Sequence, residues 1–233
     1  MANFFTVNNI YSPIRLFGIE HLSMLFLSLF LQFIVLKFIK NGNKWLCKTL
    51  SILIIIEEII RCCWFYKSGL SNIIARGLPL WHCSVAMIFL IISSFNNNEK
   101  LLKLGSYWGF IGALCALIYP GSLLEYNYSF PHMVHLSHFS SHLYLLLVST
   151  YNIFIRKIGM NKTDYKFALK SIIIFNTIMC IFNNMMGTDY AFVSKFLYSS
   201  YCIPSVLCLC IVTLFLWLLL SIESVLIKHN KIR

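Results

Sequence analysis

The chain has 233 residues and a formal net charge of +11 at pH 7, with 59% hydrophobic and only 12% charged residues. Roughly a quarter of the residues in ordinary soluble proteins are charged, so this composition excludes a water-soluble domain. The basic residues flank apolar blocks, a placement that favours membrane orientation and contact with anionic lipid. We therefore expect no nucleic-acid partner.

Seven apolar blocks follow one another along the chain, each long enough to form a helix across a hydrocarbon layer about 30 Å thick. The spans are expected to be helical because lipid cannot hydrogen-bond a free backbone amide. The first block lacks the small-residue cleavage pattern of a signal peptide, so we expect it to be a true span. We predict an all-α polytopic integral membrane bundle, with one transmembrane domain over residues 1–233. The predicted spans are about 18–39, 45–66, 78–95, 101–120, 136–155, 168–185 and 203–227.

The distribution of lysine and arginine over the connectors predicts the orientation of the bundle. One set of connectors, together with the carboxy-terminal tail, carries fourteen basic residues, and the opposite set carries four. Basic connectors are cytoplasmic in membrane proteins, so we expect the amino terminus outside and the carboxy terminus in the cytoplasm. The predicted location is the cell membrane, with multiple passes. Nearly all reactive side chains then share the extracytoplasmic half of the membrane.

Two adjacent carboxyl groups, Glu57 and Glu58, lie in the outer half of the second predicted span. An ionisable group in a span costs about 2.5 to 3.5 kcal/mol on insertion scales and usually faces the bundle interior. Neighbouring residues on a helix point about 100° apart, so we expect one of the two to face inward. The pattern is equally compatible with a functional role and with a Glu57–Arg61 ion pair that holds the bundle together.

The segment Leu78–Ser84, at the start of the third predicted span, places a thiol near a helix amino terminus. Pro79 suits the first turn of a helix, where its missing amide proton is no loss. Cys83, one turn later and directly after His82, would lie near the positive end of the helix dipole, which favours a thiolate. A cysteine in an apolar span is more commonly a small hydrophobic residue, and the chain has eight others, so a packing role stays open.

Four histidines accompany the start of the fifth predicted span: His132, His135, His138 and His142, at spacings of three, three and four. If this segment is helical throughout, they occupy an arc of about 120° on one face. One histidine on an apolar face is normally a hydrogen-bonded packing residue, whereas four on one stripe indicate chemistry. Proton handling, metal or haem binding, and general base catalysis all stay open. A metal is disfavoured because the sequence offers few partner ligands outside the third span.

The sixth predicted span ends in a polar segment that contains Asn183, Thr188, Asp189 and Tyr190. With Gly187 among them, these residues are typical of a capped helix end followed by a turn. A functional interpretation is also open, in which they form a polar floor that orients an imidazole or binds a lipid headgroup.

Together these segments resemble the YwaF-like integral membrane family, which also includes a mammalian seven-span acyltransferase that acts on ether phospholipids. The resemblance covers most of the chain and depends on the order of four short patterns. They are an acid in span two, Leu-Pro-Leu-x-x-Cys-Ser at 78–84, Phe-Pro at 130–131 followed eleven residues later by His142, and Asn-x-x-x-Gly-Thr-x-Tyr at 183–190. The chain departs from the family at Trp81, where the family usually has a histidine, and His82 stands one position further on.

The resemblance implies a catalytic pair, with Cys83 as the nucleophile and His142 as the base. The implied reaction is acyl transfer on lipid: the thiolate attacks a fatty acyl ester, and the thioester then passes its acyl group to an acceptor. An outward-facing site has no direct access to cytoplasmic acyl-CoA, so a membrane phospholipid is the expected donor and partner. The supporting or substrate-binding residues that we expect are His82, His138, Glu57, Glu58, Asn183, Thr188, Asp189 and Tyr190.

Two other classes of function stay open at this point. A non-enzymatic proton-linked transporter or sensor would use Glu57 or Glu58 and the histidines along a polar pathway. A haem- or metal-binding membrane protein is the other class. For the acyltransferase we expect neither a cofactor nor a metal, and the sequence predicts no particular oligomeric state.

Overall fold

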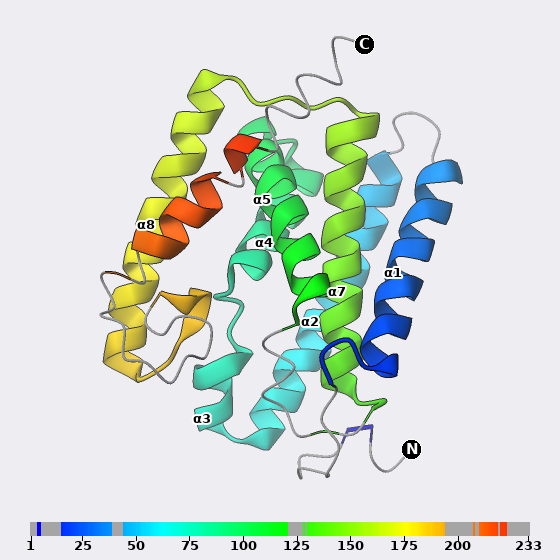
Figure 1. Ribbon diagram of the computed structural model, residues 1–233, viewed down its shortest axis with the longest axis vertical. Coiled ribbons are helices and arrows are strands. Elements are labelled where there is room, and N and C mark those ends of the chain that lie inside the picture. The colour runs from blue at the N-terminus through cyan, green and yellow to red at the C-terminus, as the bar shows by residue number, and fades with distance from the viewer. Residues whose placement is uncertain are drawn as a thin grey trace.

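The structure is a computed structural model that describes residues 4–5, 15–38, 44–120, 128, 130–193, 207, 210–218 and 220–222. Every regular element in these residues is a helix, which confirms the predicted all-α class (Figure 1). The long helices are α1 (Ile19–Phe38), α2 (Lys44–Ser68), α4 (His82–Asn96), α5 (Glu99–Ile118), α7 (Met133–Thr150) and α8 (Lys162–Met186). The shorter elements are α3 (Leu70–Asn72), the π-helical turns η1 (Ile73–Gly77) and η2 (Tyr151–Ile155), the 3₁₀ turn η3 (Tyr190–Phe192), and a helical segment over Cys210–Ile222.

Length and composition qualify α1, α5 and α8 as helices that can cross a membrane. The segments Leu70–Gly77 and His82–Asn96 pass the same test as a bent pair, which makes four candidates in the described part of the chain. Helices α1 and α8 also expose many large apolar side chains, which a membrane environment explains and water does not. The chain is therefore a membrane protein, whereas the seven crossings and their direction stay predictions.

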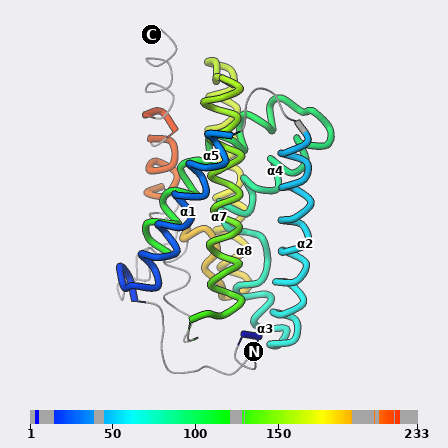
Figure 2. Tube along the Cα trace, turned by 90° about the vertical axis from the view of Figure 1, so that its right-hand side faces the viewer, coloured from blue at the N-terminus to red at the C-terminus, as the bar shows by residue number. Residues whose placement is uncertain are grey.

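Helix α7 lies inside the bundle, and Figure 2 shows it between α1 and α2. Helix α5 packs closely against it. At Gly109 of α5 the two helices come so close that a Cβ atom would lie 2.6 Å from Leu145 Cδ1 and 2.8 Å from Ser149 Oγ of α7. A larger residue would force the helices apart, so the glycine permits this contact. The buried core is centred here, on aromatic side chains such as Tyr107 and Trp108.

Helix α8 begins at Lys162, before the predicted span 168–185. The reason is a capping box. The Asn161 side chain accepts a hydrogen bond from the Asp164 amide at 2.8 Å, and the Asp164 carboxylate accepts one from the Asn161 amide at 3.0 Å. Such caps satisfy amides that a helix start leaves without partners, so the polar first turn is stable. The last predicted span, 203–227, extends outside the described residues at both ends.

The third predicted span, 78–95, starts too early. Helix α4 begins at His82, and Pro79 lies in the non-helical link that follows Gly77, so the prediction of Pro79 in a first helical turn is wrong. The chain bends by 81° between Leu70–Gly77 and α4. Because α4 starts late, Cys83 is its second residue and lies close to the helix amino terminus, as the sequence predicted.

Candidate functional site

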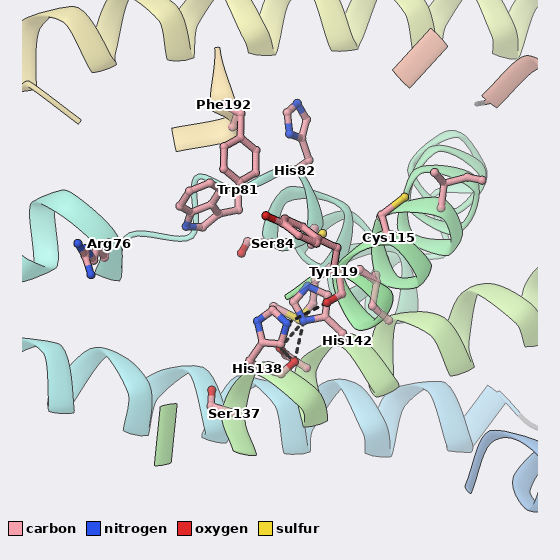
Figure 3. A pocket seen from close by; sticks show the side chains of 18 of the residues that line it. Arg76, Trp81, His82, Ser84, Cys115, Tyr119, Ser137, His138, His142 and Phe192 are labelled. Carbon is pink, nitrogen blue, oxygen red and sulfur yellow. Dashed lines mark hydrogen bonds between the residues drawn. The ribbon is translucent and has the colours of Figure 1, made fainter. Parts of the chain in front are cut away.

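A cavity of about 480 Å³ lies inside the bundle, between α2, α4, α5 and α7. Residues of η1, of η3 and of the segment Cys210–Ile222 complete its wall. Figure 3 shows His82, Ser84, His138 and His142 gathered around this hollow. The predicted site residues that line it are Cys83, His142, His82, His138 and Glu58. Segments that are far apart in the sequence therefore bring the two central residues of the predicted site, Cys83 and His142, to one cavity.

Cys83 is half-buried, and its sulfur faces helix α5 across the cavity wall. A Cβ atom on Gly112 would lie 3.1 Å from Cys83 Sγ, which is tighter than ordinary contact. Gly112 lines the cavity as well, so the missing side chain keeps space open beside the sulfur. Sequence reasoning missed this residue. A glycine inside a predicted span, where it weakens the helix, was the available signal.

His142 presents one ring nitrogen that is fixed by a hydrogen bond. Its Nδ1 lies 2.6 Å from the carbonyl oxygen of His138, one helical turn earlier. A carbonyl oxygen can only accept, so Nδ1 carries the proton and the lone pair is on Nε2. This tautomer is the form of imidazole that a general base requires, and the residue lines the same cavity as Cys83.

His138 links α7 to α5 and supports His142. Its Nε2 donates a hydrogen bond to the carbonyl oxygen of Ala116 on α5, at 3.2 Å. The ring centroids of His138 and His142 are 4.2 Å apart, with 38° between the ring planes. His138 therefore positions His142 twice, through its own carbonyl oxygen and through ring contact.

The other two histidines of the run lie outside this group. His132 precedes α7 in an extended conformation and stacks on Tyr128, with ring centroids 4.1 Å apart. His135 is fully buried, beside His132 and Phe130. The expectation of four imidazoles on one helical stripe is therefore wrong, because the helix begins after the first of them. The run divides into an inner pair at the cavity and an outer pair in an aromatic cluster.

The two carboxyl groups of α2 have different partners. Glu58 lines the cavity and forms an ion pair with Arg61, with Oε2 at 2.5 Å from Nη2 and 3.1 Å from Nε. Glu57 lies outside the described lining and accepts a hydrogen bond from Ser140 Oγ at 2.6 Å. The expected Glu57–Arg61 pair is thus corrected: Arg61 pairs with Glu58, three residues away on the helix.

His82 is held by a residue that the sequence analysis missed. Its Nε2 lies 2.8 Å from Oδ1 of Asn176 on α8, and Asn176 Nδ2 donates to Thr213 Oγ1 at 2.9 Å. Asn176 is fully buried, and an amide in an apolar span was the signal that could have identified it. His82 lines the cavity, and this contact ties the start of α4 to α8.

The polar residues at the end of α8 and in the turn after it form hydrogen bonds with one another. Asn183 Oδ1 accepts hydrogen bonds from Thr188 Oγ1 at 2.8 Å and from the Tyr190 amide at 2.9 Å, and its Nδ2 donates to the Tyr190 carbonyl at 2.7 Å. Gly187 ends α8 with a φ of 66°, as in a glycine cap. Asn183, Thr188, Asp189 and Tyr190 lie outside the described lining of the cavity. The hydrogen bonds of Asn183 with Thr188 and Tyr190 match the first interpretation of this segment, a capped helix end followed by a turn.

Tyr190 connects this turn to the link that precedes Cys83. The Leu78 amide donates to Tyr190 Oη at 3.1 Å, and Oη lies 3.3 Å from the carbonyl oxygen of Ile73. The Trp81 ring packs against Tyr190 and Phe192, with centroid distances of 5.4 Å and 5.0 Å. Burial raises the pKa of the Tyr190 phenol to about 12, so it keeps its proton in this role.

Further polar residues reach the cavity without having been predicted to do so. Arg76 of η1 was counted only for orientation, yet it lines the cavity, as do Arg61, Cys115 and Tyr119. Within the described residues, no three His, Cys, Asp or Glu side chains gather as a metal site. The reactive side chains at the cavity therefore include three histidines, two thiols and charged groups on α2 and η1.

The fold and this cavity define a membrane protein that is helical throughout its described elements, with a partly polar cavity among its helices. The chain belongs to the TMEM164 family, whose model matches residues 16–226. No curated protein and no solved structure matches it. The family match covers every residue of the cavity wall described above.

Proposed function

We propose that this chain is a membrane-embedded lipid acyltransferase or transacylase, with Cys83 as nucleophile and His142 as base. The single observation that carries the proposal is that Cys83 and His142 line one cavity, with the His142 lone pair left on Nε2 by the bond from Nδ1 to the His138 carbonyl. A nucleophile and an oriented base that share one cavity are the groups that covalent acyl transfer requires. The motif resemblance to the YwaF-like family supports the same pair.

The reaction consists of two acyl transfers. In the first, Cys83 Sγ bonds to the ester carbonyl carbon while its proton passes to His142 Nε2. The ester C–O bond then breaks, and the leaving oxygen takes that proton from His142. In the second, an acceptor hydroxyl gives its proton to Nε2 and attacks the thioester, the S–C bond breaks, and the proton returns to sulfur. The acyl group moves from one oxygen to another, and the protein ends unchanged.

The proposal assigns supporting roles differently from the sequence analysis. Asn183 and Thr188 use their polar atoms to close the turn after α8, so they act by holding Tyr190 and the link to Cys83. Two hydroxyl groups that line the cavity, on Ser84 and Tyr119, are better candidates for contact with a developing oxyanion.

The proposed frame is a seven-span protein of the cell membrane, with the amino terminus outside and the carboxy terminus in the cytoplasm. Helix α2 supports this count, because its 25 residues expose isoleucines and leucines along much of its length. In this orientation the cavity lies in the outer half of the bilayer. A membrane phospholipid is then the acyl donor, because acyl-CoA stays in the cytoplasm.

The test is acyl labelling of the purified protein with a phospholipid that carries a labelled acyl chain. We expect a hydroxylamine-sensitive adduct that is lost in Cys83→Ala and retained in Cys180→Ala, a matched thiol removal on α8. His142→Gln should slow its formation without altering the elution of the folded protein. Labelling that persists at full level in Cys83→Ala would contradict the proposal.

A second candidate is a proton-linked transporter or sensor. It is favoured by the ion pair of Glu58 and Arg61, which shares the cavity with His138 and His142. This function predicts pH-dependent flux or conformational change that survives Cys83→Ala and is lost in His142→Gln. The two candidates thus differ in the effect of removing one thiol.

A further inference from the structure

The charged residues of the cavity come from two neighbouring elements, α2 and η1. Arg61 and Glu58 belong to α2, and Arg76 belongs to η1. Figure 3 shows Arg76 at one side of the hollow, with Trp81 and Ser84 between it and Cys115 at the opposite side. Arg61 and the turn that carries Arg76 both adjoin Phe65, another residue of the cavity wall: Arg61 Cζ lies 5.7 Å from the Phe65 ring centroid, and a Cβ atom on Gly77 would lie 3.1 Å from Phe65 Cβ. We call this charged part of the wall the arginine end and define it as Arg61, Arg76 and Glu58.

Glu58 holds one of the two guanidinium groups in place. The ion pair uses Nε and Nη2 of Arg61, and the side chains are only 15% and 20% exposed. Arg76 has contacts of its own within the protein. A guanidinium has five N–H donors in a planar fork, so a side chain that already has one partner can still bind a second acceptor.

The rest of the wall is largely apolar. Met87, Ile111, Leu145, Val212 and Phe215 are among the apolar residues that line it. Two guanidinium groups in a wall that is otherwise largely hydrocarbon match an amphiphile with an anionic group near its head. Guanidinium groups bind phosphate oxygens in pairs, which makes a phosphate the matching anion.

We infer that the arginine end is a binding site for the phosphate group of a glycerophospholipid, with Arg76 as the principal ligand and Arg61 as a second donor positioned by Glu58. The site sets the direction in which the lipid enters: phosphate at the arginines, acyl ester toward Cys83, hydrocarbon along the apolar wall. The assignment of the ester to Cys83 rests on the proposed function, whereas the phosphate site does not.

The first experiment measures binding without chemistry. Full-length Cys83→Ala protein in a neutral detergent is titrated with dihexanoylphosphatidylcholine, with dihexanoylglycerol, which has the same chains and no phosphate, and with inorganic phosphate. We expect Arg76→Gln to weaken binding of the phospholipid about tenfold, the scale of a charge-assisted hydrogen bond, and to leave dihexanoylglycerol unchanged. Arg76→Lys, which retains the charge and loses the fork, should fall between the two.

The control is Arg15→Gln, at an exposed arginine that precedes α1 by four residues and lies outside the described lining. It should change neither affinity, and every variant is checked for its elution profile and melting temperature. An equal loss of both ligands in a folded Arg76→Gln protein would overturn the proposal, and so would no loss of either. Inorganic phosphate that binds as tightly as the phospholipid would show a free-phosphate site and overturn the lipid assignment.

A second experiment separates this site from the proposed function. Otherwise wild-type protein, with and without Arg76→Gln, is acylated by the phospholipid or by p-nitrophenyl hexanoate, a neutral ester. We expect Arg76→Gln to slow only the phospholipid reaction. If no donor acylates Cys83 but Arg76→Gln still weakens phospholipid binding, the phosphate site stands and the acyltransferase falls. If acylation occurs and Arg76→Gln changes neither donor, the acyltransferase stands and the phosphate site falls.

Discussion

Helix α7 and its continuation η2 use polar residues in opposite ways at two places. Beyond its carboxy-terminal end, in η2, Asn152 is fully buried, donates to Ser106 Oγ at 3.0 Å and accepts from Arg156 Nη1 at 3.0 Å. In the middle of α7, His142 has one nitrogen bonded to its own helix and lines the cavity. One polar group closes contacts between helices, and the other remains available to a substrate.

This difference shows what a polar residue in a span indicates. Burial of a polar group costs free energy in both regions, and a closed hydrogen-bond network offsets that cost by itself. A group with an open lone pair at a cavity has no such compensation inside the protein. The second kind is therefore the stronger indicator of function, and His142 rather than Asn152 meets that criterion.

The largest expected effect is a difference in acylation rate between substitutions at two histidines of the same run, His142 and His132. His142→Gln removes the base but keeps a polar side chain of similar size, and we expect acylation of Cys83 to slow by about 10²- to 10⁴-fold, the range of general base catalysis. His132→Gln, in the outer aromatic cluster, should lower thermal stability and leave the acylation rate per folded molecule nearly unchanged. Rates are measured with the labelled phospholipid. Equal slowing in the two variants would show that the outer pair takes part in the chemistry.

Two glycines on α5 test the same contrast, because Gly109 lies at the packed α5–α7 contact and Gly112 lines the cavity. Gly109→Ala places a methyl group 2.6 Å from Leu145 Cδ1 and 2.8 Å from Ser149 Oγ, so we expect a loss of about 1 to 3 kcal/mol in stability, typical of overpacking. Gly112→Ala meets only Cys83 Sγ, at 3.1 Å. It should keep or raise stability, because alanine is about 1 kcal/mol better than glycine within a helix, while acylation slows.

Thermal unfolding and Cys83 labelling, measured on both glycine variants, decide this prediction. The expected pattern is a crossed one, in which Gly109→Ala lowers the melting temperature and Gly112→Ala lowers the rate. A Gly112→Ala protein with unchanged labelling would mean that the space beside Cys83 Sγ is not used by the acyl group.

A third variant, with an expected effect of similar or smaller size, tests the hydrogen-bond network around Asn152. Asn152→Ala leaves Ser106 and Arg156 without their Asn152 hydrogen bonds, and we expect a loss of about 1 to 3 kcal/mol in stability. The rate of Cys83 acylation per folded molecule should not change, because this network lies away from the cavity wall. A large loss of rate at full stability would show that the Asn152 network and the cavity are coupled.

Sequence reasoning predicted the helical membrane class from hydropathy alone, because apolar runs of this length have few alternatives. It also predicted Cys83 near a helix start, and it named His138, His142 and both carboxyls of α2 for one site, of which Glu58 lines the cavity and Glu57 lies outside the described lining. It did not predict which polar residues face the cavity. That depends on helix rotation and on starts such as His82 and Met133, which hydropathy does not encode.

The residues that sequence reasoning missed share one physical feature. Arg76 and Gly112 gain their significance only from neighbours that are distant in the chain, across a bend of 81° in one case and across the α4–α5 contact in the other. Conversely, Asn183 and Thr188 were expected near the substrate, yet their polar atoms are used locally. The presence of Asn183 and Thr188 at this position is therefore explained by the capping of α8 rather than by contact with the cavity.

The smallest expected effect concerns Tyr190, whose phenol is hydrogen-bonded to backbone groups of Leu78 and Ile73. Tyr190→Phe removes the hydrogen bonds of Oη with Leu78 and Ile73, so we expect a loss of about 0.5 to 1.5 kcal/mol in stability. The folded pKa is raised to about 12 from an ordinary value near 10, so the folded state retains the proton more strongly than the unfolded chain does. The stabilising contribution of Tyr190 is therefore fully present below about pH 10 and decreases as the pH rises toward 12.

Unfolding of the wild type and of Tyr190→Phe, followed from pH 7 to pH 11, measures this contribution. The difference in melting temperature should stay constant up to about pH 10 and shrink above it, because the phenylalanine variant lacks this titrating group. A difference that grows with pH would mean that the phenolate is favoured in the fold, which would contradict the buried, protonated Tyr190 that holds the Leu78 amide. Tyr190→Phe should also slow acylation only slightly, since the link before Cys83 keeps its contacts through Trp81.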